Sequence, residues 1–281
     1  MEKKQIIKQI ITFLIITSII TTGIFVWMFN GAGENIGAIL LMMWTPGISA
    51  ILTTLIYKGK FGEYGWKFGK IRFWGYSFIL PIFAAFIAYG LAWLTNLADF
   101  TTENFGYLRY ARWLGFEEPV SFGVSVILRA SLGMVFTAIF VLGEEIGWSG
   151  FLTPKLLKIT SVPITSIIVG VFWSIWHYPA IIGGIYGTGS PLWIALPGFT
   201  LVLIGASFLR TVLTLKSKNL WQGVVIHSSH NMFLMGAFWT LTVHKGFANY
   251  FVSESGVLLG VIYIIVAVLF WKFLMKKPLY Q

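Results

Sequence analysis

Two adjacent carboxylates, Glu144 and Glu145, stand at the end of an apolar run that begins near Val124. Other apolar segments further along the chain contain three histidines and an asparagine: His177, His227, His230 and Asn231. Ionisable groups at bilayer depth are costly, and those that occur there usually face the interior of a helix bundle and contact one another. We therefore expect this set of side chains to converge on one site.

These residue types favour hydrolysis. A carboxylate beside two imidazoles can hold a water molecule and remove a proton from it. An asparagine amide can donate to the oxyanion that forms when the water adds to a carbonyl carbon. The same groups are common zinc ligands, so a zinc-bound water is an alternative, although the chain has no HExxH sequence. A polar network that only locks helices together is the third interpretation.

Helical spacing assigns different surroundings to the two carboxylates. Glu144 and Glu145 are about 100° apart around a helix, so one can face the histidines while the other fixes local structure. His227 and Asn231 are four residues apart and share a face, and His230 lies beside them. Gly143 and Gly147 form a pair of small residues that allows a neighbouring helix to approach closely.

The composition places these groups in a membrane. The chain has 281 residues, of which 57% are hydrophobic and 11% charged. A soluble domain has about 25% charged residues. There is no cysteine, which excludes disulfides and a cysteine nucleophile. The net charge of +10 is expected in loops beside the bilayer and indicates no nucleic-acid partner.

Eight segments are long and apolar enough to cross the bilayer, at about 10–29, 37–57, 73–95, 122–150, 162–183, 191–214, 220–243 and 256–275. Lysines gather in alternate connections, so the positive-inside rule places both termini in the cytoplasm. We predict an all-α, polytopic protein of the cell membrane. It forms a single integral-membrane domain over 1–281 with a catalytic core at 122–243. The aromatic and basic stretch 105–116 is expected to be an interfacial amphipathic helix.

Three segments carry motifs of a known family. Residues 144–152 resemble the EExxxR motif, often extended to EExxWRGxL; residues 173–177 resemble FxxxH, with Trp173 in the Phe position; and residues 227–231 match HxxxN. In this order and spacing, the chain resembles the CPBP family of CAAX prenyl proteases and bacteriocin-processing (Abi) enzymes. The eight-helix count is also similar to that family.

The resemblance implies an intramembrane endopeptidase acting on a peptide or protein substrate, with prenylated CAAX proteins, bacteriocin-like peptides and pheromone precursors all open. Glu144 would activate the water with help from His177, while His227 and Asn231 would bind the water and stabilise the oxyanion. The residues expected to surround this catalytic set are Glu145, Ser149, Trp173 and His230. A mechanism that needs no cofactor is favoured over one with Zn²⁺, because this set can generate the nucleophile without a metal.

Ser149 departs from the family pattern, which has arginine four residues after the second glutamate. A serine hydroxyl brings no charge, so we expect Glu145 to be protonated or compensated by Arg129 or Arg210. The alternative function is a catalytically impaired relative that acts as a membrane binding or immunity protein. A transporter ranks last, since the halves show no inverted repeat. Higher activity after replacement of Ser149 with arginine would support the protease interpretation and the different roles of Glu144 and Glu145.

Overall fold

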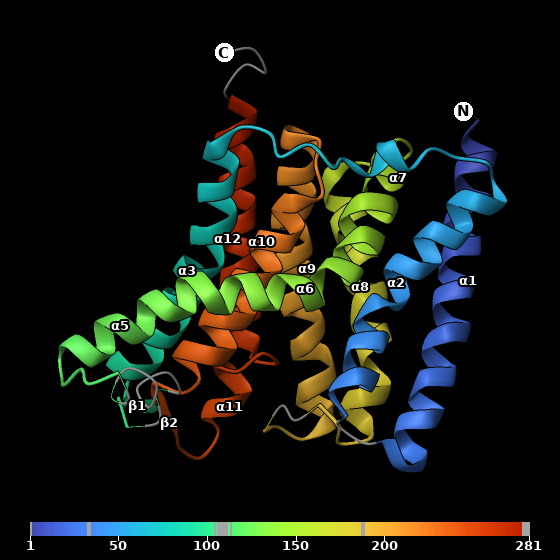
Figure 1. Cartoon of the computed structure of the whole chain (residues 1–281). Coiled ribbons are helices and arrows are strands. Elements are labelled where there is room, and N and C mark those ends of the chain that lie inside the picture. The colour runs from blue at the N-terminus through green and yellow to red at the C-terminus, as the bar shows by residue number, and fades with distance from the viewer. Residues whose placement is uncertain are drawn as a thin grey trace.

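The computed structural model describes residues 2–32, 35–103, 105, 112, 114–186 and 189–276. The predicted helix at 105–116 lies mostly outside these ranges. The described chain is built of helices (Figure 1): α1 (Lys3–Trp27), α2 (Ile36–Ile56), α3 (Ile71–Leu94), α5 (Val120–Leu128), α6 (Met134–Glu145), α7 (Thr153–Leu157), α8 (Val162–Ile182), α9 (Leu192–Ser217), α10 (Trp221–Ser229), α11 (Ala248–Phe251) and α12 (Val257–Lys276).

Short segments with other hydrogen-bonding patterns join these helices. Three of them are π-helical: η3 (Arg129–Gly133), η4 (Ile146–Leu152) and η5 (His230–Phe238). A fourth, η1 (Met28–Ala32), is a kink in which the backbone angles of Asn30 and Gly31 are not helical. One is a 3₁₀ turn, η2 (Phe61–Tyr64). Strands β1 (Ala98–Phe100) and β2 (Thr242–His244) pair antiparallel, with Asp99 opposite Val243. The all-α prediction therefore holds apart from this small ribbon.

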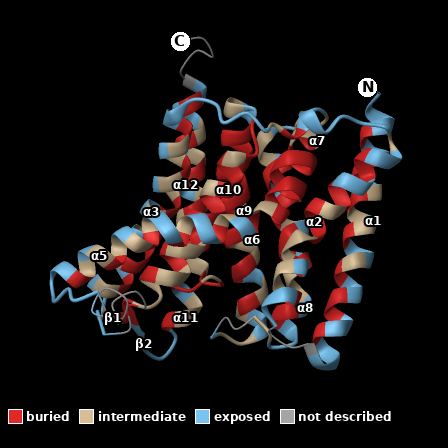
Figure 2. Cartoon of the chain, viewed as in Figure 1, coloured by how far each residue is buried: buried red, intermediate tan, exposed pale blue. Residues whose placement is uncertain are grey.

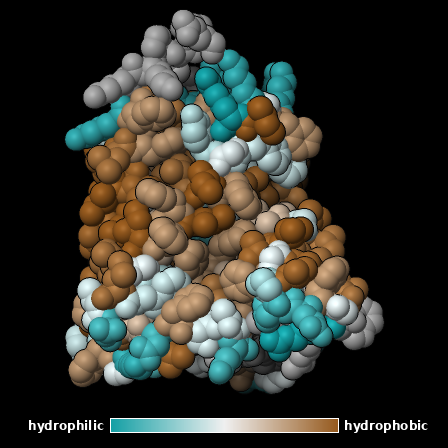
Figure 3. Space-filling view, turned by 90° about the vertical axis from the view of Figure 1, so that its left-hand side faces the viewer, coloured by the Kyte–Doolittle hydropathy of each residue, from teal (hydrophilic) through white to brown (hydrophobic). Residues whose placement is uncertain are grey.

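Seven helices of the described chain are long and apolar enough to span a membrane: Lys3–Gly31, Ile36–Ile56, Ile71–Leu94, Val120–Leu157, Val162–Ile182, Leu192–Ser217 and Val257–Met275. The eighth predicted segment is helical over α10 and η5, but its polar residues Gln222, His227, His230 and Asn231 lower its hydropathy. Figure 3 shows a broad apolar surface between polar ends of the molecule. The chain is thus a multi-pass integral membrane protein.

The fourth span, Val120–Leu157, has 38 residues, well above the roughly 20 that cross a bilayer. The extra residues allow the span to bend and change direction. In Figure 1, α5 and α6 run obliquely across the bundle, and the chain then turns through η4 to α7 near the N-terminal end of α1. Such π-helical insertions in α-helices are frequent at functional sites. Glu144 and Glu145 lie where this bend begins.

The bend packs closely against α2, as the two small residues predicted. A Cβ atom on Gly143 would lie 2.6 Å from the Cα of Trp44, and one on Gly147 would lie 2.7 Å from the carbonyl carbon of Pro46. Neither position has room for a larger side chain. Figure 2 shows buried residues throughout the middle of the bundle, where α9 and α10 lie behind this bend. The two carboxylates are therefore enclosed by helices.

The beginning of α1 and the end of α12 lie at the same end of the bundle, together with the lysine-rich connection from α2 to α3 (Figure 1). The positive-inside rule predicts that this end faces the cytoplasm. The cysteine-free chain permits a direct test with single cysteines. We expect a membrane-impermeant maleimide on intact cells to label Phe247→Cys, at the opposite end, and to label Lys67→Cys only after permeabilisation. The reverse labelling pattern would show that the protein has the opposite orientation in the membrane.

Candidate active site

A cavity of about 280 Å³ lies inside the bundle, bordered by α2, α8, α9 and the α10–η5 helix. All four predicted catalytic residues line it: Glu144, His177, His227 and Asn231. Trp173 and His230 line it too, whereas Glu145 and Ser149 do not. Residues separated by nearly ninety positions in the sequence therefore meet at one enclosed space, and the two adjacent carboxylates point in different directions.

Trp173 holds the carboxylate of Glu144. The Glu144 side chain is buried, and its Oε2 accepts a hydrogen bond of 2.7 Å from the indole Nε1 of Trp173. A phenylalanine at position 173, as in the FxxxH motif, has no donor for this bond. Trp173 therefore adds an interaction that its similarity in bulk to phenylalanine did not predict, and it fixes the orientation of Glu144 at the cavity wall.

Glu145 is the centre of a buried ionic cluster. Its Oε1 lies 3.0 Å from Nδ1 of His227 and 3.4 Å from Nε of Arg210. Its Oε2 accepts a hydrogen bond from the hydroxyl of Ser149. The Arg210 guanidinium also lies 3.8 Å from the centre of the Trp173 ring. A buried carboxylate needs such partners, because an uncompensated charge in this environment is strongly destabilising.

Arg210 supplies the positive charge beside Glu145 that Ser149 cannot provide. Of the two arginines that the sequence offered, Arg129 is engaged elsewhere: its Nη1 donates to the carbonyl of Met232 at 2.9 Å, and its guanidinium lies over the ring of Phe105. Arg210 comes from the middle of α9 rather than from the helix that carries Glu145. The positive charge expected four residues after Glu145 is supplied by a different helix.

The hydrogen bonds of His177 and His227 fix the tautomers of these two rings. Nδ1 of His177 lies 3.0 Å from the carbonyl oxygen of Trp173, which can only accept, so this nitrogen carries the proton. Nδ1 of His227 donates in the same way to the ionised carboxylate of Glu145. In a neutral imidazole the second nitrogen is then an acceptor. Each ring therefore retains an Nε2 atom that can accept a proton or a hydrogen bond.

Two further residues of the cavity, Tyr186 and Glu254, were not predicted. The Glu254 side chain is only 10% exposed; it accepts a hydrogen bond from the Tyr186 hydroxyl, and its Oε1 lies 3.4 Å from Nε2 of His230. Nδ1 of His230 in turn lies 2.7 Å from the hydroxyl of Tyr263. The sequence places Tyr186 and Glu254 in short connections, where no periodicity indicates which way a side chain points.

The environment of Glu254 favours its charged form. Burial by itself raises the pKa of this carboxyl, but the neighbouring His230 imidazole and the hydroxyl of Tyr186 outweigh it and hold the pKa below its usual value. A carboxyl pKa that falls on folding stabilises the fold at neutral pH, and this contribution is lost as the pH drops through the folded-state pKa.

Removing the Tyr186 hydroxyl is expected to destabilise the protein. Tyr186→Phe deprives the buried Glu254 carboxylate of a hydrogen bond, which costs about 1–3 kcal/mol in the free energy of unfolding. Chemical unfolding of the purified protein at neutral pH measures this loss. Tyr250→Phe is the matched control, because the Tyr250 hydroxyl makes no hydrogen bond with the rest of the described chain. Equal stability of the two variants would contradict the assignment.

Among the described residues, no group of three or more His, Asp and Glu side chains is placed to hold a metal ion. The carboxylate of Glu145 is held by Arg210 and His227, and Glu144 is held by Trp173.

A known protein family matches the part of the chain that contributes most of the predicted site residues. Residues 122–233 match the family model described as Type II CAAX prenyl endopeptidase Rce1-like. The matched stretch includes Glu144, His177, His227 and Asn231, and it ends before Glu254. No curated protein matches the chain.

Proposed function

We propose that this chain, which carries an Rce1-like domain of the type II CAAX prenyl endopeptidase family over residues 122–233, is an intramembrane endopeptidase. The observation that carries the proposal is the cavity lined together by Glu144, His177, His227 and Asn231. A carboxylate, two imidazoles with an available nitrogen and an amide are the groups that hydrolysis of a peptide bond by a bound water requires. The catalytic core extends over 122–243 within a single membrane domain.

Each residue has a distinct role in the proposed reaction. Glu144 removes a proton from the water, and Nε2 of His177 accepts the second hydrogen of that water and so orients it. The water oxygen attacks the carbonyl carbon of the substrate, and Glu144 then passes its proton to the leaving amine. Asn231 donates to the oxyanion, since its amide has no hydrogen bond to another described residue.

His227 acts as a water-binding group in this scheme. Its Nδ1–H is committed to Glu145, so Nε2 can accept from water but has no hydrogen to give an oxyanion. Glu145 fixes this tautomer, and Arg210 keeps Glu145 ionised. The alternative of an impaired, non-catalytic relative depended on the missing arginine at position 149. The charge that Arg210 supplies favours the catalytic interpretation.

The proposed substrate is a peptide or protein with an apolar segment in the cell membrane. Much of the cavity wall is apolar and rich in methionine, a flexible side chain that adapts to irregular apolar groups; these residues include Met28, Ile39, Met42, Met43, Leu203 and Met235. Such a wall suits a prenylated CAAX-type sequence or a bacteriocin-like precursor. We propose no nucleic-acid partner.

Cleavage by the purified full-length protein tests the proposal. Prenylated CAAX peptides and leader peptides of bacteriocin type serve as substrates. His177→Ala and His227→Ala are each expected to reduce kcat at least about a hundred-fold, the usual range for a group in acid–base catalysis. His244→Ala, which alters a histidine stacked on Trp239 outside the cavity, is the matched control. Full activity of both cavity variants would reject the proposal.

A chelation experiment separates the two mechanisms. We expect activity to survive exhaustive treatment with a chelator, because Glu144 and His177 activate the water without a metal. Loss of activity on chelation, with recovery on adding Zn²⁺, would replace the glutamate mechanism by a zinc mechanism.

A further inference from the structure

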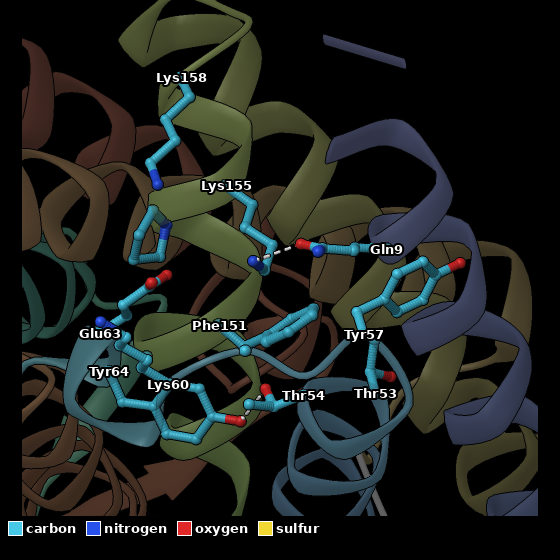
Figure 4. A pocket seen from close by; sticks show the side chains of 13 residues that line it. Gln9, Thr53, Thr54, Tyr57, Lys60, Glu63, Tyr64, Phe151, Lys155 and Lys158 are labelled. Carbon is cyan, nitrogen blue, oxygen red and sulfur yellow. Dashed lines mark hydrogen bonds between the residues drawn. The ribbon is translucent and has the colours of Figure 1, made fainter. Parts of the chain in front are cut away.

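A second cavity, of about 240 Å³, lies between the N-terminal part of α1, the connection from α2 to α3 and α7 (Figure 4). Its walls come from α1, α2, η2, the end of η4 and α7. No residue lines both this cavity and the one that holds Glu144. It is therefore separate from the candidate active site, and the proposed hydrolysis makes no use of it.

The lining of this cavity is basic. Three lysines, Lys60, Lys155 and Lys158, contribute to it, and its one acidic residue is Glu63. Figure 4 shows Lys155 and Lys158 extending from the α7 region on the side of the cavity opposite Tyr64. Positive charges that line one cavity repel one another. An anion bound between them would relieve this repulsion and would be attracted by all three ammonium groups.

One of these lysines is held in place, and the other two are available. Nζ of Lys155 donates to Oε1 of Gln9 at 2.6 Å and lies 4.7 Å from the centre of the Phe151 ring. The ammonium groups of Lys60 and Lys158 form no hydrogen bond or salt bridge with another described residue. Two exposed lysines without a polar partner among the described residues therefore line a cavity that also has a third, hydrogen-bonded lysine in its wall.

Polar side chains line the inner wall of the cavity. The hydroxyls of Tyr64 and Thr54 are hydrogen-bonded to each other at 2.6 Å, and that of Tyr57 to Thr12 at 3.0 Å. Burial raises the pKa of Tyr64, so its hydroxyl stays neutral beside a bound anion. This wall offers oxygen and hydroxyl groups to a hydrated headgroup rather than to an acyl chain.

The outer flank of the same region is apolar. Ile11 on α1 and Leu55 and Ile56 on α2 are 50%, 57% and 61% exposed, and each is close in sequence to residues that line the cavity. These side chains belong against lipid tails. The cavity thus lies where the polar end of the protein meets the apolar belt, which is the depth of phospholipid headgroups.

We propose that this cavity binds the phosphate of an anionic phospholipid headgroup. A basic pocket between membrane helices is a recurrent site for such headgroups. The three lysines would contact the phosphate oxygens, the polar wall would contact the rest of the headgroup, and the acyl chains would lie along Ile11, Leu55 and Ile56. Glu63 opposes binding and tunes its strength.

Binding of full-length protein to vesicles tests the proposal independently of any protease activity. The probes are vesicles of phosphatidylcholine alone and of phosphatidylcholine with phosphatidylglycerol in equal parts, and native mass spectrometry after extraction measures the phosphatidylglycerol retained. Each lysine near a membrane surface contributes about a five-fold change in affinity for an anionic lipid. Lys60→Gln combined with Lys158→Gln is therefore expected to weaken phosphatidylglycerol retention roughly twenty-five-fold.

Two further variants exclude a general effect on folding or charge. Glu63→Gln is expected to strengthen retention, which an unfolded protein would not do. Lys67→Gln with Lys216→Gln removes the same charge from the same end but outside the cavity, and it is expected to leave retention unchanged. Equal loss in both lysine pairs, or equal retention of phosphatidylcholine and phosphatidylglycerol, would overturn the proposal.

A competition experiment with inorganic phosphate distinguishes a site for a lipid phosphate from a site for free phosphate. If the site takes a lipid, phosphate at physiological concentration neither displaces phosphatidylglycerol nor raises the unfolding temperature in phosphatidylcholine vesicles. A rise in that temperature that depends on Lys60 and Lys158 would show that the site binds soluble phosphate instead, and would overturn its assignment to a lipid.

Discussion

Glu144→Gln is expected to reduce kcat for peptide cleavage about a thousand-fold, the middle of the range for loss of a general base. Glutamine has the size of glutamate, and its amide oxygen can still accept the hydrogen bond from Nε1 of Trp173. It cannot accept the proton of the attacking water. The fold should therefore be retained while the chemical step fails, so KM should change far less than kcat.

The matched control for this variant is Glu117→Gln, which neutralises an exposed acid far from the cavity in the described structure. It is expected to leave both kinetic constants unchanged. Activity of Glu144→Gln close to that of the unmodified protein would remove Glu144 from the mechanism, even if the histidine variants were inactive.

Arg210→Met is expected to destabilise the protein by about 3–5 kcal/mol, the usual cost of leaving a buried charge without its partner. Arg210 is 2% exposed and is the cation nearest to the Glu145 carboxylate among the described residues. Methionine keeps the length and apolar volume of the side chain but not the charge. Chemical unfolding of the purified protein measures the change, and cleavage should be lost as well because the tautomer of His227 is no longer fixed.

A second substitution tests whether the site needs one positive charge from either position. In the unmodified protein, Ser149→Arg would add a second guanidinium near Glu145 at a position only 1% exposed, so we expect this variant to be less stable and no more active than the unmodified protein. In the Arg210→Met background, Ser149→Arg should restore much of the stability. Failure of this rescue would mean that Arg210 has a role besides balancing Glu145.

The spans were predictable because hydropathy and length are visible in the sequence, and seven of the eight predicted segments are apolar spans of the described chain. The segment at 220–243 is not among these apolar spans, because the histidines and the asparagine that line the cavity lower its hydropathy. The bend of the span at Val120–Leu157 was not predictable. It depends on two π-helical insertions and on the close approach of α2, which are properties of packing.

The convergence of Glu144, His177, His227 and Asn231 was predictable for a related reason. Polar groups in apolar helices have few stable surroundings other than one another. The sequence left two arginines, Arg129 and Arg210, as candidate partners of Glu145. It could not decide between them, because the direction in which Arg210 points depends on how α9 is oriented about its own axis. Glu254 was missed altogether, since it enters the cavity from a connection whose course depends on the tertiary fold.

Water is the nucleophile in the proposed reaction, and its oxygen can be followed directly. A single turnover in water enriched in heavy oxygen, with the substrate peptide and the full-length protein both analysed by mass spectrometry, measures where that oxygen goes. We predict that it appears in the new carboxyl terminus of the product, that the Glu144 side chain stays unlabelled, and that Glu144→Gln forms product about a thousand-fold more slowly. Heavy oxygen in the Glu144 carboxylate, or labelled product from Glu144→Gln at a rate close to that of the unmodified protein, would contradict a water activated by Glu144.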